Sequence, residues 1–264
     1  MNLVIIGSGN VATVLGRLFT ASGCSVLQVW SPVHGHASAL ATQLGASVAP
    51  SVLELRRDAD LYLLCVSDAA VYDLASVLSL GDSLVAHTAG AVPMSVLSSV
   101  SSSYGVLYPL QSLQRSGLPS SIPFLVDGSS SSSLASLSSY AALLSGVVRV
   151  AGDAQRLAMH VAGVLVNNFP NYLYTLTASF LSARGYDFSL LQPLILETAS
   201  RLSHFSPSEV QTGPAVRGDE VTIERHMELL ESDEELQEWY WLFSEHIRAR
   251  SLPRTDGSAQ PPAV

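Results

Sequence analysis

The chain contains no lysine, and all thirteen of its basic residues are arginines. Mechanisms that need a lysine base or a lysine Schiff base are therefore excluded. Only two cysteines are present, Cys24 and Cys65, and both lie in apolar segments. Two isolated cysteines form neither a disulfide framework nor a metal site, so we expect both to be buried thiols.

Charged residues are also scarce, at 13% of the chain, and the formal net charge is −9. Nucleic-acid binding requires a basic surface, so we expect no nucleic-acid partner. Although 48% of the residues are hydrophobic, no apolar run approaches the roughly 20 residues that cross a bilayer. The first residues also lack the basic leader of a secretory signal. We therefore expect a cytoplasmic protein that does not enter a membrane.

Residues 2–150 alternate short apolar runs with segments of helical periodicity, the pattern of a parallel sheet covered by helices. The predicted strands are rich in valine and leucine, as strands buried on both faces should be. They are Leu3–Ile6, Ser25–Trp30, Leu61–Val66, Ser83–His87, Val106–Leu107, Pro123–Val126 and Val147–Val150. The predicted helices span about 10–21, 35–44, 51–56, 69–78, 93–99 and 133–144. The sequence therefore predicts an α/β domain over residues 1–151.

Strand patterns stop near Asp153, and leucine, valine and alanine then recur with helical spacing. We expect Asp153 to cap a long helix, and Pro170 to kink it because proline cannot donate to the carbonyl of Val166. The sequence thus predicts an all-helical domain over residues 152–250 and a disordered tail over 251–264.

Residues 7–12 read Gly-Ser-Gly-Asn-Val-Ala, a G-x-G-x-x-A pattern between the first predicted strand and a helix. We call these residues the glycine loop. Gly7 allows the tight turn, Gly9 lets the backbone approach a pyrophosphate, and Ala12 keeps the helix close to the sheet. With a second strand at the right distance, this pattern predicts a Rossmann domain that binds a dinucleotide. A glycine turn in an unrelated α/β fold is the alternative.

The predicted cofactor site combines the glycine loop with residues that follow neighbouring strands at the same edge of the sheet. We expect cofactor contacts from Gly7, Ser8, Gly9, Asn10, Val11, Ser31, Val66, Ser67, Asp68, Thr88 and Ala89. For Asp68, a plain helix N-cap is an equal alternative.

The end of the second strand, Trp30-Ser31-Pro32, bears on the choice of cofactor. An NAD enzyme usually places a carboxylate there, on the ribose 2′-hydroxyl. A carboxylate would repel a 2′-phosphate, whereas Ser31 can donate to one, with help from His34 or His36. We therefore predict NADP, with NAD as the alternative, although no arginine follows Ser31 to bind the phosphate.

Three polar residues of the long helix are candidates for chemistry. His160, Asn167 and Asn171 lie at i, i+7 and i+11 and so share one helix face. His160 could donate a proton to a carbonyl or imine as hydride arrives, because histidine ordinarily titrates near neutrality. The asparagines would then orient the substrate. The alternative is a hydrogen-bonded stripe that joins helix to helix.

A second polar cluster, Gln211–Asp219, contains two glycines and a proline and should form a loop. Arg217 in this loop could bind an anionic substrate through two hydrogen bonds. Equally, Asp219 could cap the next helix and Arg217 could pair with it.

Four segments carry a resemblance to a known family: His87-Thr-Ala-Gly90, Tyr108-Pro-Leu-Gln-Ser112, Asn167-Asn-Phe-Pro-Asn171 and Gln211-Thr-Gly-Pro-Ala-Val-Arg-Gly-Asp219. With the glycine loop, they resemble Rossmann proteins that carry a C-terminal DUF2520 domain, often grouped with the coenzyme F420-dependent NADP oxidoreductases. The resemblance runs from the glycine loop to about residue 247. It implies a C-terminal domain like that of 6-phosphogluconate dehydrogenase and a homodimer joined through this domain.

The chain departs from related proteins at two places. Relatives usually have His-Pro where this chain has Tyr108-Pro109, so the role of that histidine does not transfer. Enzymes with related helical domains often use a lysine in the helix that here holds His160, so a lysine mechanism does not transfer either. The family name mentions F420, but no residue here indicates a deazaflavin pocket.

The sequence thus predicts an NADP-dependent oxidoreductase that transfers hydride between the nicotinamide and a small carbonyl or imine substrate. The alternative from another class is a non-catalytic NADP-binding redox sensor. Pyrroline-5-carboxylate reductase or prephenate dehydrogenase activity would rest on likeness of fold alone, and we do not expect either.

Overall fold

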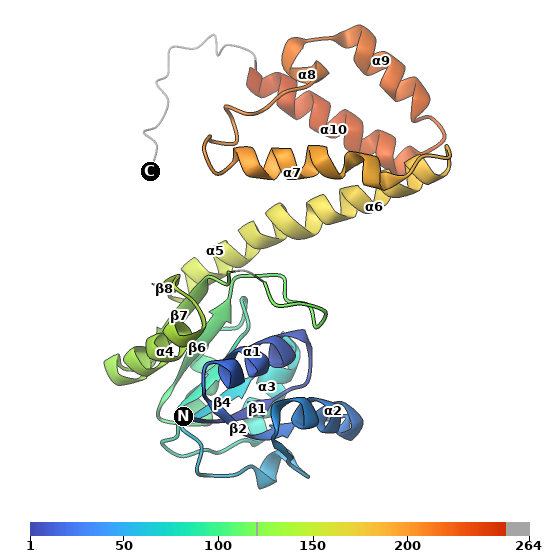
Figure 1. Cartoon of the computed structure of the whole chain (residues 1–264). Helices are drawn as coiled ribbons and strands as arrows, with labels where there is room; N and C mark the ends of the chain where they lie inside the picture. The colour runs from blue at the N-terminus through green and yellow to red at the C-terminus, as the bar shows by residue number, and fades with distance from the viewer. Residues whose placement is uncertain (120, 252–264) are drawn as a thin grey trace. The chain divides into compact units, whose positions relative to one another are not determined.

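The computed structural model describes residues 1–119 and 121–251. The chain forms two compact units, Met1–Asn168 and Phe169–Val264. The first unit is a sheet covered by helices, and in the second unit the described residues form helices and no strands (Figure 1). The predicted fold class, an N-terminal Rossmann domain followed by a helical domain, is therefore confirmed.

One sheet organises the first unit, with the strand order β3-β2-β1-β4-β5-β6-β7-β8. The strands are β1 (Asn2–Ile6), β2 (Ser25–Trp30), β3 (Ser47–Val48), β4 (Leu61–Leu64), β5 (Val85–His87), β6 (Tyr104–Pro109), β7 (Phe124–Gly128) and β8 (Val148–Val150). Strands β1 to β6 are parallel, and β7 runs antiparallel to β6. This is the doubly wound order, in which ligands bind at the carboxyl ends of the strands near the β1/β4 reversal.

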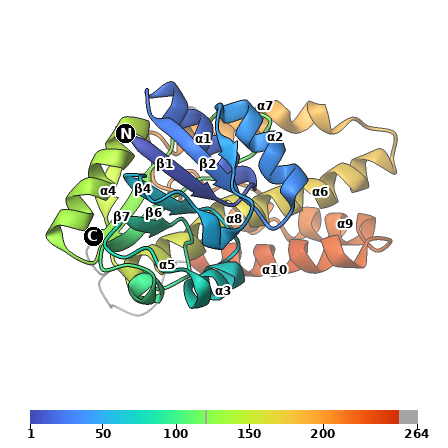
Figure 2. The ribbon, with the colours of Figure 1, turned by 90° about the horizontal axis from the view of Figure 1, so that it is seen from below.

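Alternate residues of the central strands enter two separate cores. Leu3 and Ile5 of β1 belong to the cluster under α1 (Asn10–Ala21), α2 (His34–Leu44) and α4 (Ser131–Leu144). Their neighbours Val4 and Ile6 belong to the cluster under α3 (Asp68–Val77). Figure 2 shows α1 and α2 on one side of the sheet and α3 on the other. Burial on both faces explains why the strands read as unbroken apolar runs.

Three local predictions for the first unit need correction. The helices expected over 51–56 and 93–99 are short 3-10 turns, Val52–Glu54 and Met94–Ser99. Helix formation is cooperative, so such short segments gain too few hydrogen bonds to offset the cost of nucleation. The edge strand β3 escaped prediction because two residues show no alternation.

The first unit does not end with the sheet. Its last strand ends at Val150, close to the predicted boundary at residue 151, but the unit continues through α5 (Asp153–Gly163) to Asn168. Asp153 is the first residue of α5 rather than its cap, which is Gly152. The Asp153 carboxylate instead accepts hydrogen bonds from the backbone of Met94 and from Arg156, so it joins the helix to the loop after β5.

A π-helical turn, Val164–Asn168, follows α5. We expected a kink at Pro170, and the irregularity lies in the turn just before it. Because Pro170 has no N–H to offer the carbonyl of Val166, the regular α-helical pattern cannot run through this point. Single π turns are frequent at functional sites.

The second unit comprises α6 (Phe169–Ser182), a 3-10 turn (Phe188–Leu191), α7 (Gln192–Arg201), α8 (Pro214–Arg217), α9 (Glu220–Leu229) and α10 (Glu234–Ser251). Of the predicted tail over 251–264, Ser251 is the last residue of α10, and 252–264 lie outside the described residues. Over the part of the chain that is described, no helix is both long and apolar enough to span a bilayer.

Candidate functional site

The glycine loop joins β1 to α1, and the structure explains its glycines. Gly7 has a φ of 122°, and a Cβ there would lie 2.1 Å from the carbonyl oxygen of Cys65. Only glycine fits this turn. At Gly9, by contrast, a Cβ would meet nothing within 4 Å, so the backbone faces open space. The N-terminus of α1 follows at Asn10 and presents unpaired N–H groups to that space.

A cavity of about 550 Å³ lies beside the glycine loop. Among the residues predicted to contact a cofactor, eight line it: Gly7, Ser8, Gly9, Asn10, Val11, Ser31, Val66 and Ser67. Its other lining residues were not predicted: Trp30, Pro32, Cys65, Ala70, Asp73 and Leu74. The first three adjoin predicted residues in sequence, whereas Ala70, Asp73 and Leu74 come from the first turns of α3. Folding thus gathers the ends of β1, β2 and β4 around one hollow.

The end of the cavity at β2 carries hydroxyl groups. Ser8 Oγ donates to Ser31 Oγ at 2.8 Å, which links the glycine loop to the end of β2. His34 and His36, suggested as helpers of Ser31, are exposed in the first turn of α2 and do not line the cavity. The one carboxylate among the described lining residues is Asp73 of α3. The end of β2 therefore offers a hydroxyl group and has no carboxylate of its own.

Three predicted contact residues lie apart from this cavity. Asp68 is the exposed first residue of α3, and Ser67 occupies the N-cap position, so the N-cap alternative for Asp68 is wrong. Thr88 and Ala89 are buried, and the Thr88 hydroxyl donates to the carbonyl of Leu64 at 3.3 Å. Contacts from these three residues to a cofactor remain a prediction.

The two cysteines are buried thiols, as predicted. Burial raises the pKa of Cys65 to about 12, so its thiolate is not populated near neutrality. Among residues 1–119 and 121–251, no cluster of histidine, cysteine or acidic side chains is suited to hold a metal ion.

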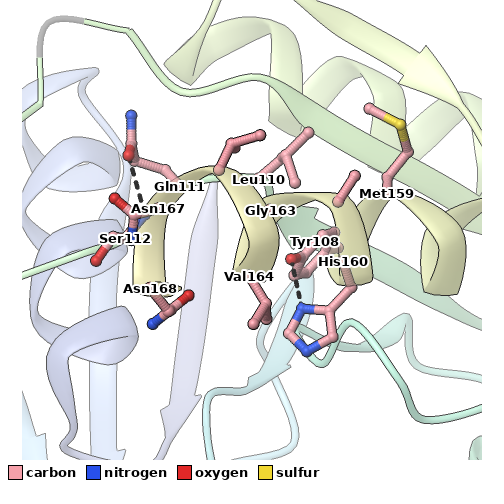
Figure 3. Close-up of a pocket in the computed structure, with 12 residues that line it drawn as sticks. Tyr108, Leu110, Gln111, Ser112, Met159, His160, Gly163, Val164, Asn167 and Asn168 are labelled. Carbon is pink, nitrogen blue, oxygen red and sulfur yellow. Dashed lines mark hydrogen bonds between the residues drawn. The ribbon is translucent and has the colours of Figure 1, made fainter. Parts of the chain in front are cut away.

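A second cavity, of about 580 Å³, adjoins the carboxyl end of β6 and the end of α5. Its lining residues are Tyr108, Leu110, Gln111, Ser112, Met159, His160, Ala162, Gly163, Val164, Val166, Asn167 and Asn168. Figure 3 shows His160 pointing toward Tyr108, with the asparagines one to two turns further along the helix. His160 and Asn167, predicted to share a helix face, therefore line one cavity. Asn171 belongs to the other compact unit, and its role remains a prediction.

Tyr108 and His160 form the central pair of this cavity. Tyr108 Oη and His160 Nδ1 are 3.0 Å apart, and the two rings meet edge to face. The imidazole also packs against Gly90, where a Cβ would lie 2.7 Å from the ring. A side chain at Gly90 would displace the imidazole, so this glycine gives His160 its place. Tyr108 was not among the predicted site residues, because relatives carry histidine at this position. Its place near the carboxyl end of a strand, where ligands bind in such sheets, was the signal that could have identified it.

Burial favours the neutral form of Tyr108. Burial is the largest influence and raises the pKa of Tyr108, and the negative charge of Asp68 acts in the same direction. The positive charge of Arg156 opposes them but does not prevail. Tyr108 therefore stays a protonated phenol at neutral pH.

The buried side chain of Arg156 joins the start of α5 to the loop after β5. Arg156, one helical turn before His160, is only 1% exposed and donates to the carbonyl of Val92 and to Asp153. His87, at the end of β5, is fully buried, and its pKa falls to about 4, first because of burial and second because of Arg156. A neutral imidazole beside a buried guanidinium avoids two adjacent positive charges.

In the cluster Gln211–Asp219, the structure shows the helix cap and ion pair that we gave as the alternative to substrate binding. Asp219 is the N-cap of α9 and accepts a hydrogen bond from the backbone of Thr222, while Arg217 lies 4.0 Å from its carboxylate. The Arg217 side chain is 64% exposed. Its binding of an anionic substrate remains a prediction.

Comparison with known proteins gives two family matches. Residues 2–90 match the family described as NADP oxidoreductase, coenzyme F420-dependent, and residues 122–247 match a domain of unknown function, DUF2520. No curated protein sequence matches this chain.

Solved structures extend the comparison to whole chains. A Bacteroides fragilis protein described as a candidate NADP oxidoreductase is 34% identical with a TM-score of 0.88, over 94% of this chain and 98% of that chain. A Thermotoga maritima protein is 20% identical with a TM-score of 0.79, over 94% and 99%. A reductive aminase from Aspergillus terreus, solved with NADPH and ethyl-5-oxohexanoate, is 17% identical with a TM-score of 0.71, over 94% of each chain. The chain therefore belongs to the family of NADP-binding, oxidoreductase-like proteins that join an F420-dependent-type Rossmann domain to a DUF2520 domain.

Proposed function

We propose that this protein is an NADP-dependent oxidoreductase that transfers hydride between the nicotinamide and a small carbonyl or imine compound. The observation that carries the proposal is the Tyr108–His160 pair in a cavity at the carboxyl end of β6. The glycine loop follows the carboxyl end of β1. Because these strands are parallel, both features belong to the same edge of one sheet.

The residues at the glycine loop fit a dinucleotide phosphate. The open backbone at Gly9, the N-terminus of α1 and the hydroxyls of Ser8 and Ser31 provide donors without a nearby aspartate or glutamate on β2. This donor set supports NADP over NAD. When bound, the reduced cofactor supplies the hydride.

The Tyr108–His160 pair supports proton transfer to the substrate. Because Tyr108 stays protonated, its hydroxyl can donate to His160 Nδ1. In that arrangement the neutral imidazole carries its proton on Nε2, the nitrogen not used by Tyr108. His160 would give this proton to the carbonyl oxygen or imine nitrogen during reduction while its Nδ1 takes the hydroxyl proton of Tyr108, and solvent would then return a proton to the Tyr108 oxygen. The reverse reaction would run the same transfers backwards.

The cavity walls indicate the kind of substrate. Leu110, Met159 and Val164 provide apolar surface, and Asn167 and Asn168 provide amides that can orient a polar group. A volume of about 580 Å³ falls in the range of small-molecule sites. These walls contain no charged side chain, so they suit an uncharged carbonyl or imine. The A. terreus reductive aminase has a similar fold and binds NADPH with a keto ester, which supports the same class.

The first test is fluorescence titration of the purified protein with NADPH and NADH. Tighter NADPH binding is expected, and failure to bind either nucleotide would end the proposal. Turnover is then measured with NADPH and a panel of small ketones and cyclic imines. His160→Asn should lower kcat about 100-fold, the usual size of a general-acid contribution, with no change in NADPH affinity.

Two further variants sharpen this test. Tyr108→Phe should lower kcat less than His160→Asn, because it removes the partner of the imidazole but not the imidazole itself. The control is His226→Asn, because His226 forms a similar edge-to-face pair with Tyr240, 2.8 Å from Nδ1 to Oη, and neither residue lines the two cavities described above. Unchanged turnover in His160→Asn would refute the catalytic role. High NADPH affinity without turnover of any substrate would favour the redox-sensor alternative.

The second unit supports the expected homodimer. Its apolar side chains are extensively exposed, with Leu190, Leu194 and Leu196 between 65% and 70% exposed. Large exposed apolar surfaces mark sites of association. Sedimentation equilibrium of the full chain should therefore give twice the monomer mass, and a monomer at high concentration would contradict this part of the proposal.

A further inference from the structure

Arg115 lies next to the glycine loop, although it is 107 residues from Ser8 in the sequence. It belongs to the segment between β6 and β7, and its Nη2 donates to the carbonyl oxygen of Ser8 at 2.8 Å. Ser8 lines the nucleotide-sized cavity and donates from its side chain to Ser31. A guanidinium group thus contacts the backbone of a residue that we predict to contact the cofactor.

Other contacts hold Arg115 at this place. Arg17 of α1 donates from Nη1 to the carbonyl oxygen of Arg115 at 2.9 Å and from Nη2 to Gln43 at 3.0 Å. Leu113 and Ile122, which flank Arg115 along the segment, are 7% and 3% exposed and enter the core under α1. The segment is therefore anchored on the same face of the sheet as the helix whose N-terminus faces the cavity.

Arg115 places a positive charge beside a cavity whose own lining has none among the described residues. No arginine follows Ser31, where NADP-binding domains often place one, and the chain has no lysine. The described lining of the cavity contains one charged side chain, the carboxylate of Asp73, which would repel a phosphate. Arg115 does not line the cavity itself, but its positive charge contacts Ser8, which does. Its guanidinium has five N–H donors in a planar array, and the contact with Ser8 uses one nitrogen.

We propose that Arg115 binds a phosphate group of the dinucleotide held at the glycine loop. The inference rests on the proposed function, because it assumes that a nucleotide occupies this cavity. The pyrophosphate and the 2′-phosphate offer the same chemistry to a guanidinium, and the two are distinguished by comparing nucleotides.

The test is the dissociation constant of NADPH and of NADH for the full-length protein and its variants, measured by fluorescence titration at low and high salt. Arg115→Ala should weaken NADPH binding about tenfold, as the loss of one charge-assisted hydrogen bond predicts. The loss should shrink at high salt. Equal weakening of NADPH and NADH would assign Arg115 to the pyrophosphate, whereas weakening of NADPH alone would assign it to the 2′-phosphate.

The matched control is Arg149→Ala, because Arg149 is an exposed arginine of the same unit, donates to the carbonyl of Val148 and does not line the cavity. It should bind both nucleotides like the wild type. If Arg115→Ala lowers the Tm, Arg115→Gln takes its place, since it keeps part of the stem and loses the charge. Wild-type affinity in the Arg115 variants would overturn the inference. Absence of binding by the wild-type protein would instead refute the proposed function, so the two failures are distinguishable.

Discussion

The first unit buries apolar side chains on both faces of its sheet, whereas the second unit leaves many of its apolar side chains exposed. Leu61, Leu63 and Phe124 in the first unit have no exposed surface. Among the described residues of the second unit, only Ala215, Leu230 and Ser244 are buried. A sheet with helices on both sides buries the apolar side chains of both faces within one unit. The helices of the second unit leave apolar surface exposed, which favours association with another protein surface.

The second unit also has polar contacts on its surface. Arg248 of α10 pairs with Glu220 of α9 and with Glu245, and Tyr172 of α6 donates to Glu235. Exposed ion pairs contribute little to stability. We therefore expect core substitutions to destabilise the first unit strongly and surface substitutions to destabilise the second unit little.

Leu63→Ala should lower the free energy of unfolding of the first unit by about 2–5 kcal/mol, the usual range for a buried leucine. Leu63 is fully buried in the centre of β4, so its removal leaves a cavity. Urea unfolding followed by circular dichroism would measure the change. A loss below about 1 kcal/mol would mean that the first unit repacks more freely than its core suggests.

Acid should destabilise the first unit through His87. The pKa of His87 is lowered from its ordinary value of 6.5 to about 4 in the folded protein, by burial and then by Arg156. Between these pH values the unfolded chain binds more protons, so stability falls as the pH falls from 6.5 toward 4. The loss should reach about 3 kcal/mol.

Unfolding experiments across this pH range, on the wild type and on His87→Asn, would check the prediction. Asparagine cannot take up the proton, so its curve should be flatter in this window. Equal slopes for the two proteins would show that His87 does not titrate as its environment requires.

Removing a helix cap should lower the free energy of unfolding by the same amount in both units, because a cap depends on local geometry and not on a core. Ser130 caps α4 by accepting from the backbone of Ser133, and Asp233 accepts from the backbone of Leu236 at the start of α10. Substituting either by alanine should cost about 1 kcal/mol, measured by thermal unfolding. A much larger loss at Asp233 would show that α10 depends more on its cap than α4 does.

Leu196→Ser should have the smallest effect on unfolding within one chain, below about 0.5 kcal/mol, since the side chain is 70% exposed. If the exposed face of α7 joins two copies, the same variant should weaken the homodimer, which sedimentation equilibrium would detect. An unchanged association constant would place the dimer surface elsewhere.

Much of the first unit was predictable because its patterns are local. The glycine loop, the Val- and Leu-rich strands and the helical periods each occupy a short stretch, and the residues at Gly7–Val11, Ser31 and Val66 do line one cavity. The wrong predictions were those that rested on short or weak local patterns. The turns Val52–Glu54 and Met94–Ser99 were predicted as α-helices, and Asp153 as a cap, because each has local features that its tertiary contacts override.

The pairs that define the candidate chemistry were not predictable in this way. Tyr108 and His160 are 52 residues apart, and Ser8 and Arg115 are 107 apart. The fold class, the residues around the cavity at the glycine loop and the candidate role of His160 followed from local patterns, because periodicity and turn chemistry act over a few residues. The tyrosine that faces His160 and the arginine that contacts the glycine loop are known from the folded chain alone, because these contacts depend on the order of the strands in the sheet.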